Sequence, residues 1–423
     1  MAIVSALPVE VHPVITMSHR PRTAALPNLA SWFARVRAWR YAGDKRDLRL
    51  DALRGIAAIA MIVDHVGGSE SWLYRVTGGN KFFVSGAEAF VLIAGLTMGI
   101  VYVRLIASGG IWAAARKALR RAGVLYVLTV LLTFGFAGAS ILGGAPWRPD
   151  IAPAEVPAWM LSVATLQRTY YLADILLMYV LLMIAAVPAL AALAFRHTRW
   201  LLAASWGLWL AWQFAPQYLA IPWPIANNVM FHFSSWQVIF VTGLAVGFHG
   251  DRIEAVVRRF WPMPILGVSA VVAAALIALY MVGTRRGLFD EGGTLFWLFM
   301  DKRDVPIGRL FSLAVFFVLG YGVLMLAWRP VHRVAGWLLM PLGQHALPAY
   351  SLHLFALVAW GYVLPTWTVE RSATWNAAIQ LAALASVWLA VVAWIRFERH
   401  LPGRHPVPPS VEPTTETAPA HAA

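Results

Sequence analysis

The amino-acid sequence predicts an all-α, polytopic integral membrane protein. Of its 423 residues, 60% are hydrophobic and only 13% are charged, and the mean hydropathy is +0.66. Soluble globular domains carry about 25% charged residues, so the composition excludes an ordinary soluble domain. Because only helices and closed barrels satisfy their backbone inside lipid, the long apolar stretches predict membrane-spanning helices.

About ten such stretches can be drawn, each roughly long enough to cross a bilayer with some tilt. The fifth and sixth are the shortest of them. In chain order they cover residues 50–66, 82–103, 122–142, 170–195, 200–215, 235–249, 263–283, 308–327, 337–363 and 374–396. The sequence therefore predicts one membrane domain over residues 46–400.

Basic residues indicate the orientation of these helices. Most of the 34 Lys and Arg residues lie in alternate connections, and cytoplasmic connections are enriched in these residues. Both termini are therefore predicted to be cytoplasmic. The net charge of +14 then reflects this bias and attraction to anionic membrane lipid. Nucleic acid is not an expected partner, because no soluble basic domain is present to bind it.

The two ends of the chain differ from the membrane domain in composition. Residues 1–45 lack a continuous apolar core, so no cleavable signal peptide is expected. Within them, residues 29–40 form either a basic amphipathic surface helix or part of a poorly ordered leader. Residues 401–423, rich in Pro, Thr and Ala, are expected to be a disordered cytoplasmic tail.

The absence of cysteine limits the chemistry that the chain can perform. With no cysteine, disulfides, thiolate catalysis and cysteine-held metals are excluded. No metal and no permanently bound cofactor is predicted.

The first apolar stretch contains two ionisable residues, Arg54 and His65. Burying a charge in lipid costs about 2.5–3.5 kcal/mol or more, so function is the first interpretation of such residues. The two are eleven positions apart, which places them about 20° apart around the helix and about 16 Å apart along it. One helix face therefore carries a cation near the cytoplasmic surface and an imidazole about half a hydrocarbon core away.

The other intramembrane polar residues fall into an outer and an inner layer once this topology is applied. The outer layer holds Asp64, His65, Glu88, Asp174 and His353. The inner layer holds Asp51, Arg54, His345 and the basic segment 116–121.

Two such layers suit the transfer of a group from a cytoplasmic anionic donor to an acceptor outside. Arg54 is expected to bind the phosphates of a coenzyme A thioester, and His65 to remove the proton of a sugar hydroxyl. Because adjacent helix positions diverge by about 100°, we expect Glu88 or Asp174, rather than Asp64, to orient His65.

Each of these residues also has a purely structural interpretation. Arg54 would extend to the inner interface, His65 would make an interhelical hydrogen bond, and Glu88 and Asp174 would be paired structural charges. Tryptophans in the outer loops belong either to an interface belt or to sugar-stacking surfaces. These are Trp147, Trp159, Trp223, Trp297 and Trp367.

One outer connection is more highly charged than the others. It contains the run 301–309, with Lys302 and Arg309. Either this run is a solvated loop, or one of these two cations meets an anionic acyl group or a charged glycan.

Several of these residues resemble a known family. Arg54 and His65 resemble the Arg-x10-His motif of the polytopic membrane acyltransferases that modify envelope glycans, and Tyr350-Ser351-Leu352-His353 is similar to their Tyr-x-Leu-His segment. More specifically, pieces spread over about residues 46–355 resemble the OpgC family. They are Arg46–Gly55, Asp64-His65, Ala87–Phe90, Tyr171–Leu176, Ser235-Trp236-Gln237, Asp301-Lys302 and Leu342–Pro348.

OpgC proteins are succinyltransferases of osmoregulated periplasmic glucans. The resemblance therefore implies about ten helices in a bacterial inner membrane, a succinyl-CoA donor on the cytoplasmic side and a periplasmic glucan acceptor. It implies catalytic roles for His65, Asp64, Glu88 and Asp174, and a donor site at Arg54 and His345. Further acceptor-site positions are His353, Trp236, Gln237, Lys302 and Arg309.

Three alternatives remain open from the sequence. Within the enzyme class, the chain would be an acetyltransferase of another envelope polysaccharide. In a different class, it would be a transporter that uses buried His and acidic residues as a proton relay. In the third, it would be a non-catalytic scaffold for glucan synthesis.

Overall fold

The computed structural model describes residues 46–68, 70–79, 81–259, 262–293, 295–364 and 371–400. Within these ranges the regular structure is helical, and the strand-like pairing is an isolated bridge between Arg168 and Ala226. The prediction of an all-α fold is confirmed. The two predicted tails, 1–45 and 401–423, lie outside the described residues, as does Trp367.

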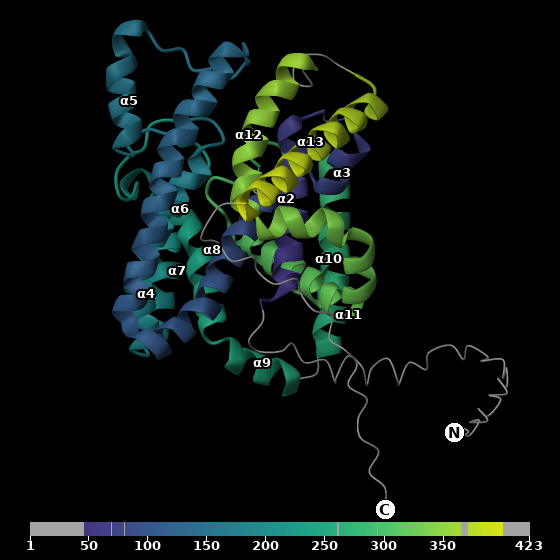
Figure 1. Ribbon diagram of the computed structural model, residues 1–423. Coiled ribbons are helices and arrows are strands. Elements are labelled where there is room, and N and C mark those ends of the chain that lie inside the picture. The colour runs from purple at the N-terminus through teal and green to yellow at the C-terminus, as the bar shows by residue number, and fades with distance from the viewer. Residues whose placement is uncertain are drawn as a thin grey trace, which may run out of the picture. The chain divides into compact units, whose positions relative to one another are not determined.

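Figure 1 shows the helices in chain order. In order they are α2 (Leu48–Val66), α3 (Trp72–Thr77), α4 (Gly86–Leu142), α5 (Val156–Ala164), α6 (Asp174–Ala194), α7 (Thr198–Phe214), α8 (Phe233–Phe248), α9 (Gly250–Arg259), α10 (Pro262–Arg285), α11 (Ile307–Gln344), α12 (Ala346–Val363) and α13 (Ala373–Arg399). Single turns stand at η1 (Pro153–Glu155), η2 (Pro216–Tyr218) and η3 (Phe296–Met300), the last of them a π-turn.

Six of the described helices are long and apolar enough to cross a membrane, namely α4, α6, α10, α11, α12 and α13. The shorter α8 is also apolar. The protein is therefore a multi-pass membrane protein. Breaks at Gly110 in α4 and at Ala327 in α11 divide these two helices into halves. With those halves counted separately, each of the ten predicted stretches lies wholly or mainly in helix.

The structure differs from the sequence prediction at one of these stretches. The predicted helix 337–363 is interrupted at His345, which has φ −113° and ψ 44° between the end of α11 and the start of α12. The physical reason is Pro348. It has no N–H to donate to the carbonyl of Gln344, four residues earlier, and its ring would clash with that carbonyl in a continuous helix. The basic connection 104–121 also differs, since it is helical except at Gly110, where φ is 75°.

Close contacts through glycine hold α2 against α11 and α4. A Cβ added to Gly55 would lie 2.4 Å from the carbonyl oxygen of Leu339, and one added to Gly343 would lie 1.8 Å from that of Asp51. On the other side, Gly86 at the start of α4 meets the backbone of α2 in the same way. Small residues allow such backbone approach in membrane proteins. The helix that carries Arg54 and His65 is therefore held firmly between two neighbours.

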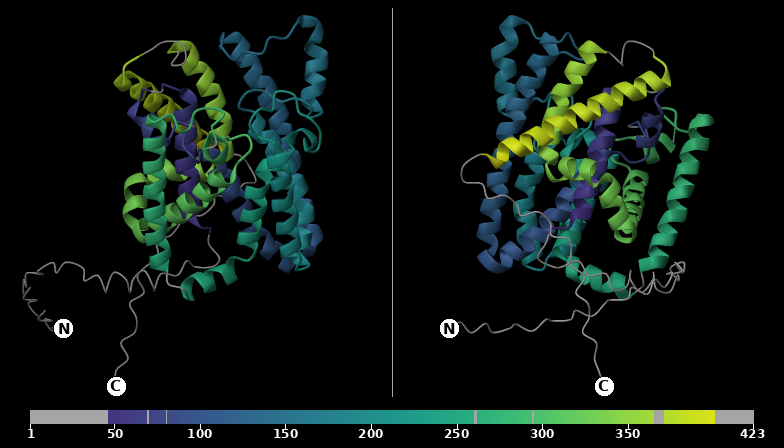
Figure 2. Two further views of the ribbon diagram at one scale, coloured as in Figure 1. Left: turned by 180° about the vertical axis from the view of Figure 1, so that it is seen from behind. Right: turned by 45° about the vertical axis from the view of Figure 1, so that its right-hand side comes forward.

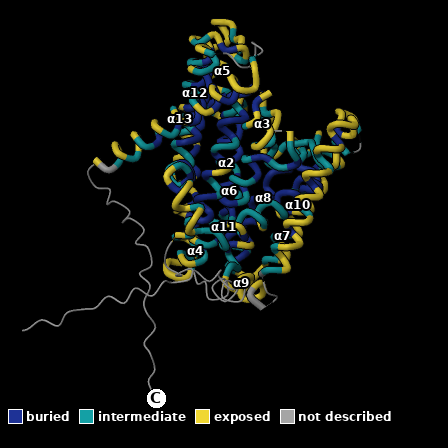
Figure 3. Tube along the Cα trace, turned by 90° about the vertical axis from the view of Figure 1, so that its right-hand side faces the viewer, coloured by how far each residue is buried: buried dark blue, intermediate teal, exposed yellow. Residues whose placement is uncertain are grey.

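Burial is uneven over the bundle. Figure 3 shows buried residues gathered along α2 and α6, whereas α5, α9 and α10 are mainly exposed. Figure 2 shows α13 crossing obliquely over α2, with which it is in contact. The two ends of α2 therefore lie in a well-packed interior, where a polar side chain requires a partner.

Candidate active site

Two histidines from opposite ends of the sequence meet at the last turn of α2. His65 Nδ1 lies 3.0 Å from His353 Nε2 on α12. Their rings are stacked, with centroids 5.2 Å apart and 28° between the planes. His353 is buried, whereas His65 keeps some exposed surface. The fold thus joins the first helix to the C-terminal motif through these two imidazoles.

The protonation of this pair follows from the contacts of His353. Its Nδ1 faces the carbonyl oxygen of Tyr350, and because a carbonyl only accepts hydrogen bonds, this nitrogen carries the proton. In a neutral ring Nε2 of His353 is then an acceptor, so Nδ1 of His65 donates to it. Nε2 of His65 is left with its lone pair and is the nitrogen able to act as a base.

Lys302 brings a positive charge to the same region. It lies in the connection between η3 and α11, is half-buried, and interacts electrostatically with His65 and with three carboxylates. Burial lowers the pKa of Lys302, while the carboxylates of Glu88, Asp174 and Asp64 act in the opposite direction. Its Nζ also lies 5.8 Å from the centroid of the Phe231 ring, within the range of a cation–π contact.

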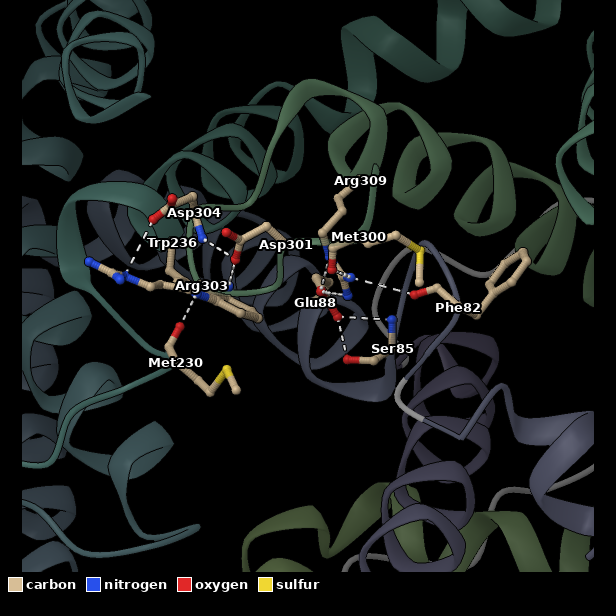
Figure 4. A network of polar contacts seen from close by, with 10 residues as sticks. All are labelled: Phe82, Ser85, Glu88, Met230, Trp236, Met300, Asp301, Arg303, Asp304 and Arg309. Carbon is tan, nitrogen blue, oxygen red and sulfur yellow. Dashed lines mark hydrogen bonds and ion pairs between the residues drawn. The ribbon is translucent and has the colours of Figure 1, made fainter. Parts of the chain in front are cut away.

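Side chains of α7 and α8 hold the backbone around Lys302. Four hydrogen bonds reach this segment, from Trp209 Nε1 to the Val305 carbonyl (2.9 Å), Trp212 Nε1 to Asp304 Oδ1 (2.9 Å), Gln213 Nε2 to the Asp304 carbonyl (2.7 Å) and Ser235 Oγ to the Arg303 carbonyl (2.9 Å). Asp301 Oδ1 accepts from the backbone N–H of Arg303 at 2.8 Å (Figure 4). The predicted loop is thus a fixed turn and not a freely solvated one.

Glu88 forms a buried ion pair with Arg309, and both side chains are 1% exposed. One carboxylate oxygen accepts from Nε and Nη2 of Arg309, and the other accepts from the backbone N–H and hydroxyl of Ser85 (Figure 4). Arg309 Nη1 donates to the carbonyls of Met300 and Phe82. These contacts correct the expectation that Glu88 orients His65, because both of its oxygens are engaged elsewhere.

The two aspartates of the outer layer are also buried. Asp64 accepts a hydrogen bond from the hydroxyl of Thr77 on α3, so it points to a different neighbour from His65, as the angle between adjacent helix positions predicts. Asp174 opens α6 and accepts from the backbone N–H of Ile175 at 3.0 Å. Both carboxylates lie near Lys302, so the fold gathers them around this cation.

Trp236 and Gln237 lie in the interior of α8. Trp236 is fully buried and its Nε1 donates to the Met230 carbonyl at 2.8 Å. Gln237 accepts from the Ser205 hydroxyl at 2.6 Å and donates to the Ser205 carbonyl at 2.8 Å. They join α8 to the preceding loop and to α7, and so support the helices that hold the Lys302 segment.

At the other end of α2, Arg54 is held inside the bundle. Its side chain is 14% exposed and Nη1 donates to Asp51 Oδ1 at 2.9 Å. Nη2 donates to the hydroxyl of Thr97 on α4. The guanidinium also interacts with Tyr179 of α6, which interacts in turn with Arg121. Arg54 is therefore directed towards α4 and α6, and a side chain simply extended to the interface would not make these contacts.

His345 lies at the junction of α11 and α12. Its Nδ1 is 3.9 Å from Glu398 Oε2 near the end of α13. Within the described ranges, no group of three or more His, Asp or Glu side chains is arranged to hold a metal ion.

Three residues with clear roles in this arrangement were not among the site residues predicted from the sequence. Tyr350 supplies the carbonyl that fixes His353, Thr77 binds Asp64, and Tyr179 links Arg54 to Arg121. A signal was present only for Tyr350, which precedes His353 by three residues and therefore lies one helical turn from it.

Fold and site together define a multi-pass helical membrane protein with a paired-histidine site at one end of α2 and a guanidinium site at the other. Residues 46–400 match the family model described as OpgC protein. The chain therefore belongs to the OpgC family and is a membrane transferase with an acyltransferase-type role in glucan modification. A comparison with curated proteins found no match.

Proposed function

We propose that the protein is an O-acyltransferase of the bacterial inner membrane that moves a succinyl group from cytoplasmic succinyl-CoA to hydroxyl groups of a periplasmic glucan. The observation that carries this proposal is the hydrogen-bonded series Tyr350 carbonyl, His353, His65. It ends in an unprotonated nitrogen of a partly accessible imidazole, which is the arrangement that general-base catalysis needs. His353 here takes the orienting place that a carboxylate takes in other acyl-transfer sites.

The reaction follows from this geometry. Nε2 of His65 removes the proton of a glucan hydroxyl as the hydroxyl oxygen attacks the thioester carbonyl carbon. The tetrahedral intermediate collapses, the carbon–sulfur bond breaks, and the imidazolium of His65 returns the proton to the leaving coenzyme A thiolate. The products are a succinyl ester and coenzyme A. His353 accepts the Nδ1–H of His65 throughout and so stabilises the imidazolium that forms.

Lys302 supports the proposal as a source of positive charge near the reacting atoms. Negative charge develops on the thioester oxygen in the tetrahedral intermediate, and a fixed cation in a partly dry site stabilises such an oxyanion. Lys302 interacts electrostatically with His65 and is half-buried. The turn that carries it is fixed by α7 and α8, so little reorganisation is needed when the charge appears.

The donor assignment depends on the separation along α2. Arg54 lies about 16 Å from His65, a span that suits a donor whose phosphates and thioester stand at opposite ends of an extended arm. The guanidiniums of Arg54 and Arg121 both interact electrostatically with Tyr179. Lys117 Nζ lies 5.6 Å from the Tyr102 ring centroid, and the Tyr102 hydroxyl also interacts with Arg121. These cations, on α2 and α4, support a phosphate path from the cytoplasmic end of the helices to Arg54.

Reconstitution tests the proposal directly. The purified protein in nanodiscs is supplied with glucan from cells lacking its gene, and with either succinyl-CoA or acetyl-CoA. Mass spectrometry of the glucan is expected to show the increment of a succinyl group only with succinyl-CoA. The increment of an acetyl group would reassign the donor, and unmodified glucan with both donors would contradict acyl transfer.

A further inference from the structure

Aromatic side chains from three segments meet beside the carboxylates of the site. Tyr171, in the turn before α6, is 41% exposed, and its ring centroid lies 5.7 Å from that of Trp147. Tyr74 of α3 interacts with Tyr171 and with Asp64. All three aromatic residues lie outside the long apolar helices. We call Tyr74, Tyr171 and Trp147 the aromatic cluster.

The turn that carries Tyr171 is tied to the histidine pair. Leu172, next to it, has a φ of 58°, a left-handed conformation that a non-glycine residue adopts only when its surroundings hold it. The Tyr350 hydroxyl donates to the Leu172 carbonyl, and the Tyr350 ring packs against His353 at 5.0 Å between centroids. The same tyrosine therefore fixes the orientation of His353 and the position of Tyr171.

The side chains of this region divide into a buried group and a group that keeps some exposed surface. Asp64, Asp174 and His353 are 2%, 8% and 2% exposed, and a molecule approaching from solvent does not meet most of their surface. His65, Lys302 and the aromatic cluster keep exposed area. The accessible side chains of this region are therefore an imidazole, an amine and aromatic rings, and the aromatic rings interact with the buried carboxylates of Asp64 and Asp174.

We propose that the aromatic cluster is a binding subsite for a pyranose ring of the acceptor glucan, with Tyr171 as the stacking surface. This inference rests on the proposed function and adds the residues that select the acceptor. A pyranose has an apolar C–H face, which packs on an aromatic ring, and a rim of hydroxyl groups, which need hydrogen-bond partners. The cluster supplies both kinds of contact beside the proposed base.

The electrostatics of Tyr171 suit this role. Burial and the nearby carboxylate of Asp174 both raise the pKa of Tyr171. The phenol therefore stays protonated at neutral pH and remains a hydrogen-bond donor to a sugar hydroxyl.

The test compares substitutions of Tyr171 by steady-state kinetics in nanodiscs. Tyr171→Ala is expected to raise the KM for glucan about 10-fold, with little change in the KM for succinyl-CoA. Tyr171→Phe keeps the ring and is expected to retain most of the affinity. Trp72→Ala is the matched control, because Trp72 is an exposed aromatic on the same short helix as Tyr74. An unchanged glucan KM in Tyr171→Ala, or an equal rise in the Trp72 control, would overturn the subsite and favour a general interface role.

A binding measurement separates this inference from the proposed function. Equilibrium dialysis without acyl-CoA uses glucan purified from cells that lack the gene. If the wild type binds this glucan, Tyr171→Ala weakens binding, and neither protein transfers an acyl group, the subsite stands while the transferase proposal fails. If the wild type transfers the group and Tyr171→Ala binds glucan as the wild type does, the transferase proposal stands while the subsite fails.

Discussion

The two ends of α2 hold ionisable side chains in different ways. Arg54 donates to Asp51, only three residues away, and Arg46 donates to the same carboxylate at 2.7 Å. His65 instead contacts another imidazole, brought in from α12. One end therefore keeps a permanent charge beside a local counter-charge, whereas the other keeps a neutral ring. Binding an anionic donor requires the first arrangement, and removing a proton requires the second.

Glu88 and Arg309 show a third way of holding charge. The sequence predicts both as site residues, as it does His65. In the structure, however, they form a fully buried pair with several further hydrogen bonds. Such a pair joins α4 to α11 and presents neither a free charge nor a free base. The comparison teaches that a buried ionisable residue is a functional candidate only after its partners are known.

The largest expected effect is at the neutral end of α2. His65→Ala removes the proposed base and is expected to lower acyl transfer by about 10²–10⁴-fold, while the protein stays inserted and abundant. Initial rates in nanodiscs measure this loss. His332→Ala, at an exposed histidine elsewhere on α11, is the matched control. Wild-type rates in His65→Ala would show that His65 is not the base, and the proposed difference between the two ends of α2 would be wrong.

The next effect concerns stability. Glu88→Gln leaves Arg309 buried without its counter-charge, and breaking such a pair is expected to cost about 3–5 kcal/mol. The thermal unfolding temperature of the detergent-purified protein should therefore fall markedly. Combining Glu88→Gln with Arg309→Met should recover part of this loss, since neither charge then remains buried. A fully stable but inactive Glu88→Gln protein would instead make Glu88 a catalytic residue.

His353 is expected to act as a positioning residue for His65. His353→Ala should reduce kcat about 10–100-fold with little change in either KM, because the base loses the acceptor that fixes its tautomer. His353→Gln restores an acceptor oxygen and should recover part of kcat. Equal losses in both variants, with an unaltered pH dependence of kcat, would indicate a packing role only.

The pH dependence of activity tests Lys302. Burial lowers the pKa of Lys302, so its positive charge is lost at a lower pH than that of an exposed lysine. Activity should therefore fall on the alkaline side as this proton leaves. Lys302→Arg, which keeps its charge above that range, should move the alkaline limb to higher pH. If the alkaline limb of the pH profile stays in the same place in Lys302→Arg, Lys302 is not the group that stabilises the oxyanion.

The smallest effect is expected at the charged end of α2. Arg54→Lys keeps the charge but loses the planar fork that binds phosphate in two places, so the KM for succinyl-CoA should rise about 10-fold. The KM for glucan should not change. Measuring the rate against each substrate separately checks this. A rise in the glucan KM alone would place Arg54 on the acceptor side and reverse the assignment of the two ends.

The sequence by itself determined the properties that depend on local geometry. Apolar length predicted the ten stretches, and the 3.6-residue helical repeat placed Arg54 and His65 on one face of one helix. The non-helical residue at His345 was also predictable from Pro348. These features follow from bonds between residues a few positions apart, so the order of the amino acids is sufficient to predict them.

The tertiary structure decided which ionisable groups meet. It paired His65 with His353 and not with Glu88, and it paired Glu88 with Arg309. It also brought Lys302 near three carboxylates from three different elements. These contacts join segments up to 288 positions apart. They depend on how closely the helices approach, as at Gly55 and Gly343, and on which turns are fixed by distant side chains. Neither spacing nor charge in the sequence contains that information, because packing between helices selects the partners.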